Sequence, residues 1–194
     1  MSLWQDLGLD QEGFVSLFDL RAAWRLQTLD QVVGHLGGCP ALVVQNVAGD
    51  SGGGASVEED IAYRRTVSPL DETGGVTLGL ERYRDRVTFL TKRPGNPFPA
   101  MIMVGRAGNC DIRISLSTVS KVQGYFLKQA SDDWLLVDQR STNGTFVNRE
   151  RLGAGERRAV QDGDLIRFGK EFTVKLFMPR SAAGLLTGTG AATS

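Results

Sequence analysis

Alternation of apolar and polar residues dominates the second half of the chain. Within residues 111–116 the apolar side chains stand at the even positions and the polar ones at the odd positions. This period of two is typical of a strand that buries one face. Further short apolar runs follow at close spacing, at residues 87–90, 101–104, 125–127, 134–137, 146–147, 165–168 and 172–176. Turn-forming Gly, Pro, Asn and Asp separate them, and the pattern predicts an all-β sandwich over residues 86–178.

The first half of the chain has a different pattern. From Phe14 to Leu26 apolar residues recur at intervals of three and four, which predicts a helix whose Phe18 and Trp24 face is core or packing surface. Thr28-Leu29-Asp30-Gln31 has the spacing of a capping box, and Gly37-Gly38 can end the helix that follows. After Pro40, residues 41–44 (Ala-Leu-Val-Val) predict a short buried strand.

These patterns divide the chain into three predicted parts. Residues 1–85 form an acidic, partly helical N-terminal region, residues 86–178 the sandwich, and residues 179–194 a tail rich in Gly, Ala and Thr that we expect to be disordered. The glycine-rich residues 50–56 are interpreted as a flexible loop, because no Gly-Lys-Ser/Thr follows that would complete a phosphate-binding loop.

Charge separates the same parts. Residues 1–85 carry 6 basic and 13 acidic side chains, a net charge of −7, whereas residues 86–178 carry 15 basic and 9 acidic ones, a net charge of +6. A basic module favours anionic ligands. Its basic residues are scattered among acidic ones and not gathered into a stripe, which disfavours nucleic acid as the partner.

Composition also excludes several classes of protein. The apolar runs are too short to cross a bilayer, and the first residues lack the basic start and apolar core of a signal peptide, so we expect a cytoplasmic protein without membrane contact. Two cysteines, Cys39 and Cys110, are too few for a disulfide scaffold. His35 is the single histidine, and neither an orienting partner nor an oxyanion site accompanies it and Cys39. We therefore expect no enzyme, no metal and no cofactor.

The stretch from Gly105 to Asn148 carries the candidate chemistry. Arg106 follows an apolar run, Ser120-Lys121 lie in a second predicted loop, and Thr142-Asn143 lie in a third. Each is ordinary alone: an arginine at a strand end is usually solvated, and Asn-Gly is first a hairpin signal. Together they offer a guanidinium, an ammonium, two hydroxyls and an amide, which are the groups that bind a phosphate and its peptide.

The order and spacing of three segments resemble the forkhead-associated (FHA) domain, a module that recognises phosphothreonine. The segments are Val104-Gly105-Arg106, Ser120-Lys121-Val122-Gln123 and residues 141–148 (Ser-Thr-Asn-Gly-Thr-Phe-Val-Asn). The resemblance implies a β-sandwich of about eleven short strands. It implies that Arg106 and Ser120 grip the phosphate, that Lys121 and Thr142 assist, and that Asn143 holds the peptide backbone. Gly105, Gln123, Gly144 and Asn148 belong to the motif as structural residues.

One position departs from the family. Three residues after the serine the family usually has a histidine that braces the binding loops, and this chain has Gln123. A glutamine side chain can donate and accept hydrogen bonds in similar directions, but its additional rotamers hold a loop less firmly.

The resemblance implies a non-catalytic phosphothreonine-peptide-binding adaptor in bacterial Ser/Thr kinase signalling. Its partner would be a phosphothreonine-containing protein, either a kinase or a kinase substrate. Thr66 and Thr73 are candidate phosphoacceptors for binding by the chain's own domain, although both also fit ordinary turn and strand positions. The alternative function is a phosphate-independent interaction or assembly scaffold that has an FHA fold.

Overall fold

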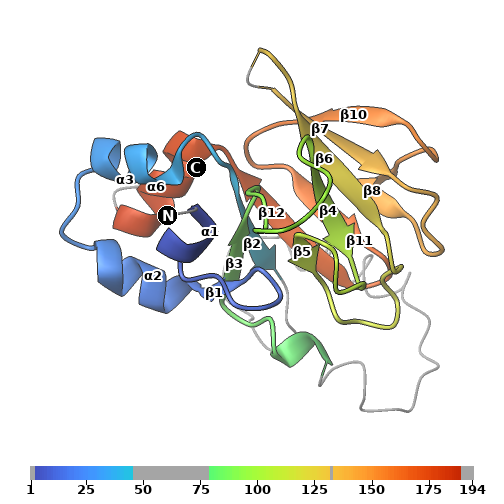
Figure 1. The fold of residues 1–194 in the computed structure, drawn as a ribbon, viewed down its shortest axis with the longest axis horizontal. Coiled ribbons are helices and arrows are strands. Elements are labelled where there is room, and N and C mark those ends of the chain that lie inside the picture. The colour runs from blue at the N-terminus through green and yellow to red at the C-terminus, as the bar shows by residue number, and fades with distance from the viewer. Residues whose placement is uncertain (1–2, 46–78, 132, 189–194) are drawn as a thin grey trace, which may run out of the picture.

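The computed structural model describes residues 3–45, 79–131 and 133–188, which form two β-sheets packed face to face with helices beside one of them (Figure 1). The helices are α1 (Leu3–Asp6), α2 (Leu17–Trp24), α3 (Leu29–Leu36) and α6 (Pro179–Thr187). The strands are β1 (Val15–Ser16), β2 (Ala41–Gln45), β3 (Arg86–Phe89), β4 (Met101–Gly105), β5 (Ile112–Arg113), β6 (Gly124–Lys128), β7 (Trp134–Asp138), β8 (Thr145–Val147), β9 (Glu150–Arg151), β10 (Arg157–Val160), β11 (Leu165–Phe168) and β12 (Phe172–Phe177).

The larger sheet has the order β1-β3-β2-β12-β11-β8-β9, and the smaller one has the order β10-β7-β6-β4-β5. Neighbouring strands pair antiparallel except β4 and β5, which pair parallel. The sandwich predicted from the alternation is confirmed. In β12 the period of two is complete, since Phe172, Val174 and Leu176 are buried and the residues between them are half-buried.

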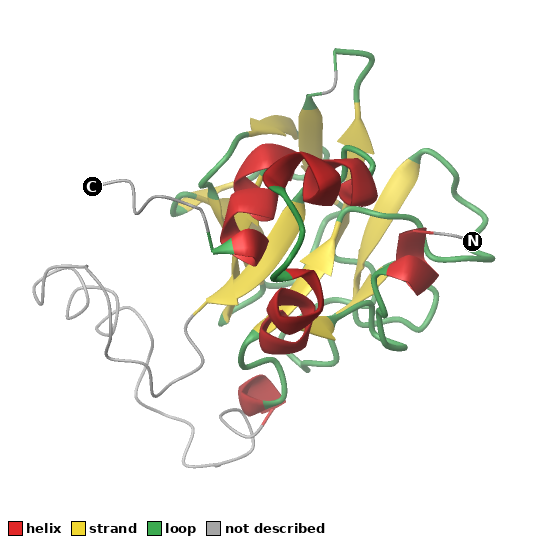
Figure 2. Ribbon diagram, turned by 90° about the vertical axis from the view of Figure 1, so that its left-hand side faces the viewer, coloured by secondary structure: helices red, strands yellow, loops and turns green. Residues whose placement is uncertain are grey.

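Strands β2 and β3 of the larger sheet are covered on both faces. One face meets the smaller sheet, where Phe168 packs edge-on against Phe126 with ring centroids 6.4 Å apart. On the other face Val43, Val87 and Phe89 pack against the helices (Figure 2). Burial on both faces explains why β2 is a continuous apolar run without alternation.

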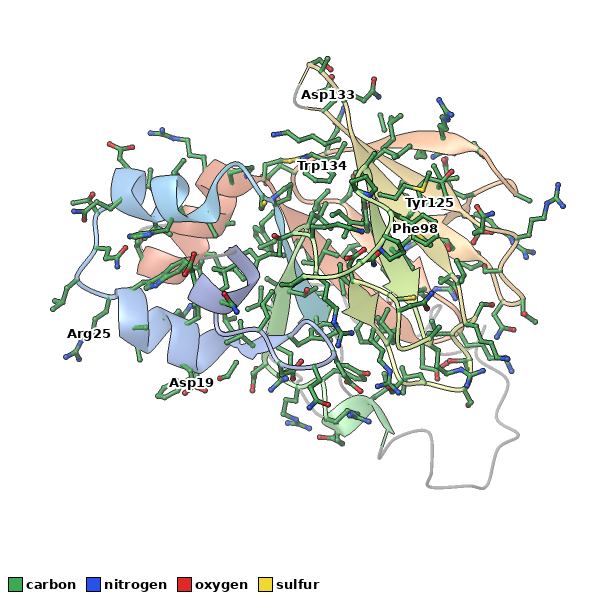
Figure 3. All side chains as sticks on the ribbon, in the orientation of Figure 1. Asp19, Arg25, Phe98, Tyr125, Asp133 and Trp134 are labelled. Carbon is green, nitrogen blue, oxygen red and sulfur yellow. The ribbon has the colours of Figure 1, made fainter. Side chains whose placement is uncertain are left out.

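The helices form a layer at one end of the molecule. Asp19 and Arg25, at α2, lie far from Tyr125 of β6 and are exposed (Figure 3). In the described part of the chain, no helix has both the length and the apolar character needed to cross a bilayer.

Local sequence signals predicted α3 correctly and α2 only in part. The capping box of Thr28 and Gln31 is present, and α3 ends at Gly37 with φ of 57°. The predicted helix start at Phe14 is wrong, because the following Val15–Ser16 pairs with β3 and Ser16 caps α2. Trp24 is buried as predicted, whereas Phe18 is 76% exposed.

Two parts of the predicted domain division do not hold. Residues 179–187 are not disordered: they form α6, which has proline in its first turn and buries Ala182, Ala183 and Leu186 against the other helices. Small residues pack closely, and Arg21 Nε donates to the Leu185 carbonyl at 3.0 Å. The boundary at residue 85 also fails, because β2 lies between β3 and β12 inside the larger sheet.

Candidate functional site

Strand register brings the three motif segments to one end of the sandwich. Val104 of β4 pairs with Gly124 of β6, which pairs in turn with Asp138 of β7. The loop after β4, the loop before β6 and the loop after β7 therefore leave the smaller sheet at the same end, opposite the β6–β7 hairpin (Figure 1). In the larger sheet Thr145 of β8 pairs with Phe168, so the loop after β7 enters the facing sheet.

Gly105 and Arg106 connect the loop after β4 to the loop before β6. A Cβ at Gly105 would lie 2.5 Å from the Lys121 carbonyl oxygen, so only glycine allows this approach. Arg106 N then donates to the Ser120 carbonyl at 2.9 Å, and Arg106 Nε donates to the Val119 carbonyl at 3.2 Å. The guanidinium is thus tethered at Nε, and the residue is exposed.

The loop before β6 and the loop after β7 are joined by hydrogen bonds that involve the Ser120 and Thr142 hydroxyls. Thr142 N donates to Ser120 Oγ at 3.0 Å, and Ser120 Oγ lies 3.4 Å from Thr142 Oγ1. Among the described residues, no carboxylate forms an ion pair with Arg106. Lys121 follows Ser120 directly and is exposed. Arg106, Ser120 and Thr142 are therefore brought together as an exposed cluster of donors.

Gln123 is fully buried and connects the same two loops from beneath. Its Oε1 accepts from Ser120 N at 3.0 Å, and its Nε2 donates to the Gly144 carbonyl at 2.9 Å and to Thr145 Oγ1 at 3.0 Å. One amide group thus provides three hydrogen bonds, which is the bracing role that the family histidine is expected to have.

Asp138 extends this network, and the sequence analysis did not identify it. The buried carboxylate accepts from Ser141 N at 2.9 Å, from Ser141 Oγ at 2.5 Å and from Thr145 Oγ1 at 2.6 Å. An aspartate that ends a strand shortly before a serine often accepts hydrogen bonds from the turn that follows, and this signal could have been read from the sequence.

The two motif asparagines have different places. Asn143 Nδ2 donates to the Thr118 carbonyl at 2.7 Å, so its amide holds the loop before β6, and Oδ1 accepts no hydrogen bond from the described residues. Asn148 lies at the opposite end of β8, where it donates to Asp164 Oδ1 at 2.7 Å and accepts from Leu165 N at 2.9 Å. Asn148 thus fixes the β8–β9 turn and lies apart from the donor cluster.

The other candidate residues lie elsewhere. Thr66 and Thr73 fall outside the described residues. The His35 ring stacks on Trp24 with centroids 5.9 Å apart. Burial raises the pKa of the Cys39 thiol, which disfavours the thiolate that a nucleophile needs.

Residues 102–169 match the family model of the FHA domain, and this match contains all three motif segments. This segment is an FHA domain.

One relative is similar to the chain over part of its own length. The E3 ubiquitin-protein ligase DMA1 of Saccharomyces cerevisiae is 26% identical over 111 residues, which cover 54% of this chain and 24% of the ligase. The chain thus spans about a quarter of that relative's length.

Two solved FHA-related structures are similar to the chain. Mycobacterium tuberculosis EmbR, in complex with a low-affinity phosphopeptide, aligns with a TM-score of 0.39 and 22% identity over 46% of this chain and 21% of EmbR. The N-terminal FHA domain of S. cerevisiae Rad53p, in complex with a phosphothreonine peptide, aligns with a TM-score of 0.43 and 16% identity over 72% of this chain and 93% of that one.

Proposed function

We propose that the FHA domain of this chain is a non-catalytic reader of phosphothreonine peptides. The observation that carries the proposal is the convergence of Arg106, Ser120 and Thr142 without a competing carboxylate among the described residues. A phosphothreonine side chain carries nearly two negative charges and three acceptor oxygens. The cluster supplies donors of the matching kind on the surface where three loops meet.

The contacts indicate what each group does. Because Ser120 Oγ accepts from Thr142 N, its own proton is free to turn from Thr142 Oγ1, at 3.4 Å, to a phosphate oxygen. The planar guanidinium of Arg106 can present two parallel N–H groups to the phosphate. Lys121 adds a mobile positive charge, and Asn143 Oδ1 offers an acceptor to a peptide N–H.

Fluorescence polarisation with one labelled peptide in three forms tests the proposal. The forms carry threonine, phosphoserine or phosphothreonine at the same position. Arg106→Ala removes charge-assisted hydrogen bonds that contribute about 1.5–3 kcal/mol, so we expect phosphothreonine affinity to fall roughly 10- to 150-fold. Arg149→Ala is the matched control, because Arg149 is also exposed and lies in the β8–β9 turn. Equal affinity for the three peptide forms would refute the proposal.

The partner follows from the ligand, because phosphothreonine is made by a Ser/Thr kinase. We propose that a bacterial kinase of this class, or one of its substrates, binds the domain through its phosphothreonine. An autophosphorylated kinase domain and its phosphatase-treated form provide the comparison. We expect the wild-type protein to retain only the autophosphorylated kinase domain. We expect the R106A variant to retain neither form. Retention of both forms would contradict this partner class.

Binding in cis is the regulated version of the same proposal. Gly79 packs against Leu116, since a Cβ there would lie 3.0 Å from Leu116 Cδ2, and Leu116 lies four residues before Ser120. The six residues from Thr73 to Gly79 span about 20 Å when fully extended, so the length of the chain allows Thr73 to reach the donor cluster. Phosphorylation should then weaken binding of a phosphothreonine peptide in the wild-type chain and not in T73A. If T66A restores peptide binding by the phosphorylated chain and T73A does not, Thr66 is the phosphoacceptor. If neither substitution restores peptide binding, binding in cis is excluded.

A phosphate-independent assembly role is the second candidate. It is favoured by Phe18, 76% exposed, and Leu26, 89% exposed, on the helical layer. Light scattering of the wild type and of Phe18→Ser tests it: a wild-type dimer that the substitution converts to a monomer supports assembly, and a monomer at all concentrations excludes self-assembly.

A further inference from the structure

A second basic site adjoins the donor cluster. A hollow of about 490 Å³ is lined by Asp138, Arg140, Ser141, Arg151 and residues 152–154. It lies beside the loop after β7, because Ser141 is a lining residue and Thr142 is the next residue of the donor cluster.

Arg151 links the hollow to that loop. Gly144 has φ of 84°, and a Cβ there would lie 2.8 Å from Arg151 Nε. The guanidinium therefore packs against the backbone of the Asn143-Gly144 turn. The same turn contacts Thr118 through Asn143, so it touches both the loop before β6 and the Arg151 side chain of the hollow.

The acidic side chains near the hollow are already engaged. Arg158 pairs with Glu150 at 2.9 Å and with Glu156 at 3.0 Å. Glu156 also accepts from Gly153 N at 2.8 Å, and this hydrogen bond, ahead of those from Arg158, lowers the pKa of Glu156. The Glu156 carboxylate is thus engaged by Arg158 and Gly153.

Asp138 is the remaining carboxylate of the hollow. It is only 3% exposed, and its oxygens accept the three hydrogen bonds from Ser141 and Thr145. Arg140 and Arg151 are both exposed and form no ion pair with a described residue. Among the residues that the structure describes, these two positive charges therefore have no carboxylate partner beside the proposed phosphate site.

The backbone of Arg140 supports a functional reading. Its φ is 55°, in the left-handed region that non-glycine residues rarely adopt. Such conformations cluster at ligand-binding loops, where the surrounding structure holds them. Arg149 of the β8–β9 turn also has a positive φ, of 74°, so what distinguishes Arg140 is that it also lines the hollow.

We propose that the hollow binds a second anionic group, a carboxylate or a further phosphate, on the same peptide whose phosphothreonine occupies the Arg106 cluster. This inference rests on the proposed function and deepens it: the domain selects phosphothreonines that are flanked by an acidic or a second phosphorylated residue. The hollow adds charge complementarity at a fixed spacing from Ser120 and Thr142.

A charge walk tests the selection. Labelled peptides carry one phosphothreonine in an alanine and serine background, with a single glutamate placed at each position from four before it to four after it. A parallel series carries a second phosphothreonine instead. An exposed ion pair contributes up to about 1 kcal/mol, so we expect roughly a fivefold gain in affinity at one spacing for glutamate, and a larger one for the phosphate dianion.

Two substitutions locate that gain. In the double variant R140Q/R151Q the gain should vanish while affinity for the singly phosphorylated peptide stays within twofold. In R149Q, which removes an exposed arginine outside the hollow, the gain should persist. A gain that survives R140Q/R151Q, or no gain at any spacing, overturns the inference. A gain for glutamate identifies an acidic neighbour, and one for the second phosphothreonine alone identifies a doubly phosphorylated ligand.

A titration with inorganic phosphate separates this inference from the proposed function. Amide resonances of Arg140, Ser141 and Gly153 are followed by NMR in the R106A variant, whose first site is disabled. We expect them to shift in R106A and not in the triple variant R106A/R140Q/R151Q, in which both sites are disabled, whatever the peptide experiments show. Absence of a shift in R106A means that the hollow binds no anion. A shift without any phosphothreonine binding by the wild type would instead refute the proposed function and leave an isolated anion site.

Discussion

Replacing Gln123 with alanine should destabilise the fold and loosen the donor cluster together. The substitution leaves the Ser120 N–H without its acceptor. The Gly144 carbonyl still accepts from Gly169 N at 3.0 Å, and the Thr145 hydroxyl still donates to Asp138. One buried donor without a partner costs about 1–3 kcal/mol, and two further lost hydrogen bonds contribute about 0.5–1.5 kcal/mol each at most. We expect a loss of about 2–6 kcal/mol in the free energy of unfolding.

Urea unfolding followed by tryptophan fluorescence measures this loss, and fluorescence polarisation with the phosphothreonine peptide measures the site. Gln129→Ala is the control, because Gln129 is exposed at the β6–β7 hairpin. Affinity should fall in Q123A even under conditions where the protein remains folded, since Ser120 is no longer fixed relative to Gly144. If Q123A and Q129A had the same midpoint of urea unfolding, or if Q123A bound the phosphothreonine peptide as tightly as the wild type, the bracing role of Gln123 would be refuted.

Gln123→His adds a second, sharper test. An imidazole has two ring nitrogens and can replace at most two of the three hydrogen bonds, so its stability should lie between the wild type and Q123A. To accept from Ser120 N the introduced ring must be neutral, which lowers its pKa in the folded state below the ordinary value of about 6.5. Its stabilisation is then present above that value and lost as the pH falls through the lowered pKa, whereas Gln123 gives no such dependence. A pH-independent Q123H would contradict the assignment of Ser120 N as its donor.

Three further predictions concern the surroundings of the site. Asp138→Ala leaves one backbone and two hydroxyl donors without an acceptor, and we expect a loss of about 2–4 kcal/mol in urea unfolding; an unchanged midpoint would remove Asp138 from the network. Deleting residues 179–194 exposes the apolar residues that α6 covers, so we expect a loss of several kcal/mol, of order 25 cal/mol per Å² exposed, with increased binding of a hydrophobic dye; a fully stable truncated chain would show that α6 is dispensable. Burial raises the pKa of Tyr83 to about 12, so the stability that comes from its neutral form is present below the ordinary value near 10 and is lost as the pH rises toward 12. The wild type should therefore lose its advantage over Tyr83→Phe between pH 10 and 12, and a constant difference over that interval would contradict the shift.

Local signals made part of the fold predictable. The period of two needs no knowledge of neighbouring strands, and the capping box of Thr28 and Gln31 involves residues three positions apart. The position of β2 was not predictable in this way, because its pairing with β12 joins residues that are more than 125 positions apart in the sequence. The helix α6 was missed because Ala and Gly are typical of loose tails, and burial of these small residues is visible only when the surface that receives them is known.

The same distinction applies to the candidate site. Arg106, Ser120, Thr142 and Gln123 were predictable because their order and spacing follow a family pattern. Thr145 looks like an ordinary β-branched strand residue, and its link between Gln123 and Asp138 depends on how two sheets face each other. Arg140 and Arg151 were unremarkable charges in the sequence. The role proposed for them depends on Arg158, which pairs with both nearby glutamates.

The strand order sets the limits within which this recognition module can be moved between proteins. The family match ends at residue 169 and begins at residue 102, yet β2, β3 and β12 lie outside it in the middle of the larger sheet. A fragment cut at the family limits would retain every loop that faces the ligand and lose the strands on which β11 and β8 depend. Fusion partners should therefore be joined outside residues 3–188, because the portable unit is the two sheets with their helices and not the segment that the family model matches.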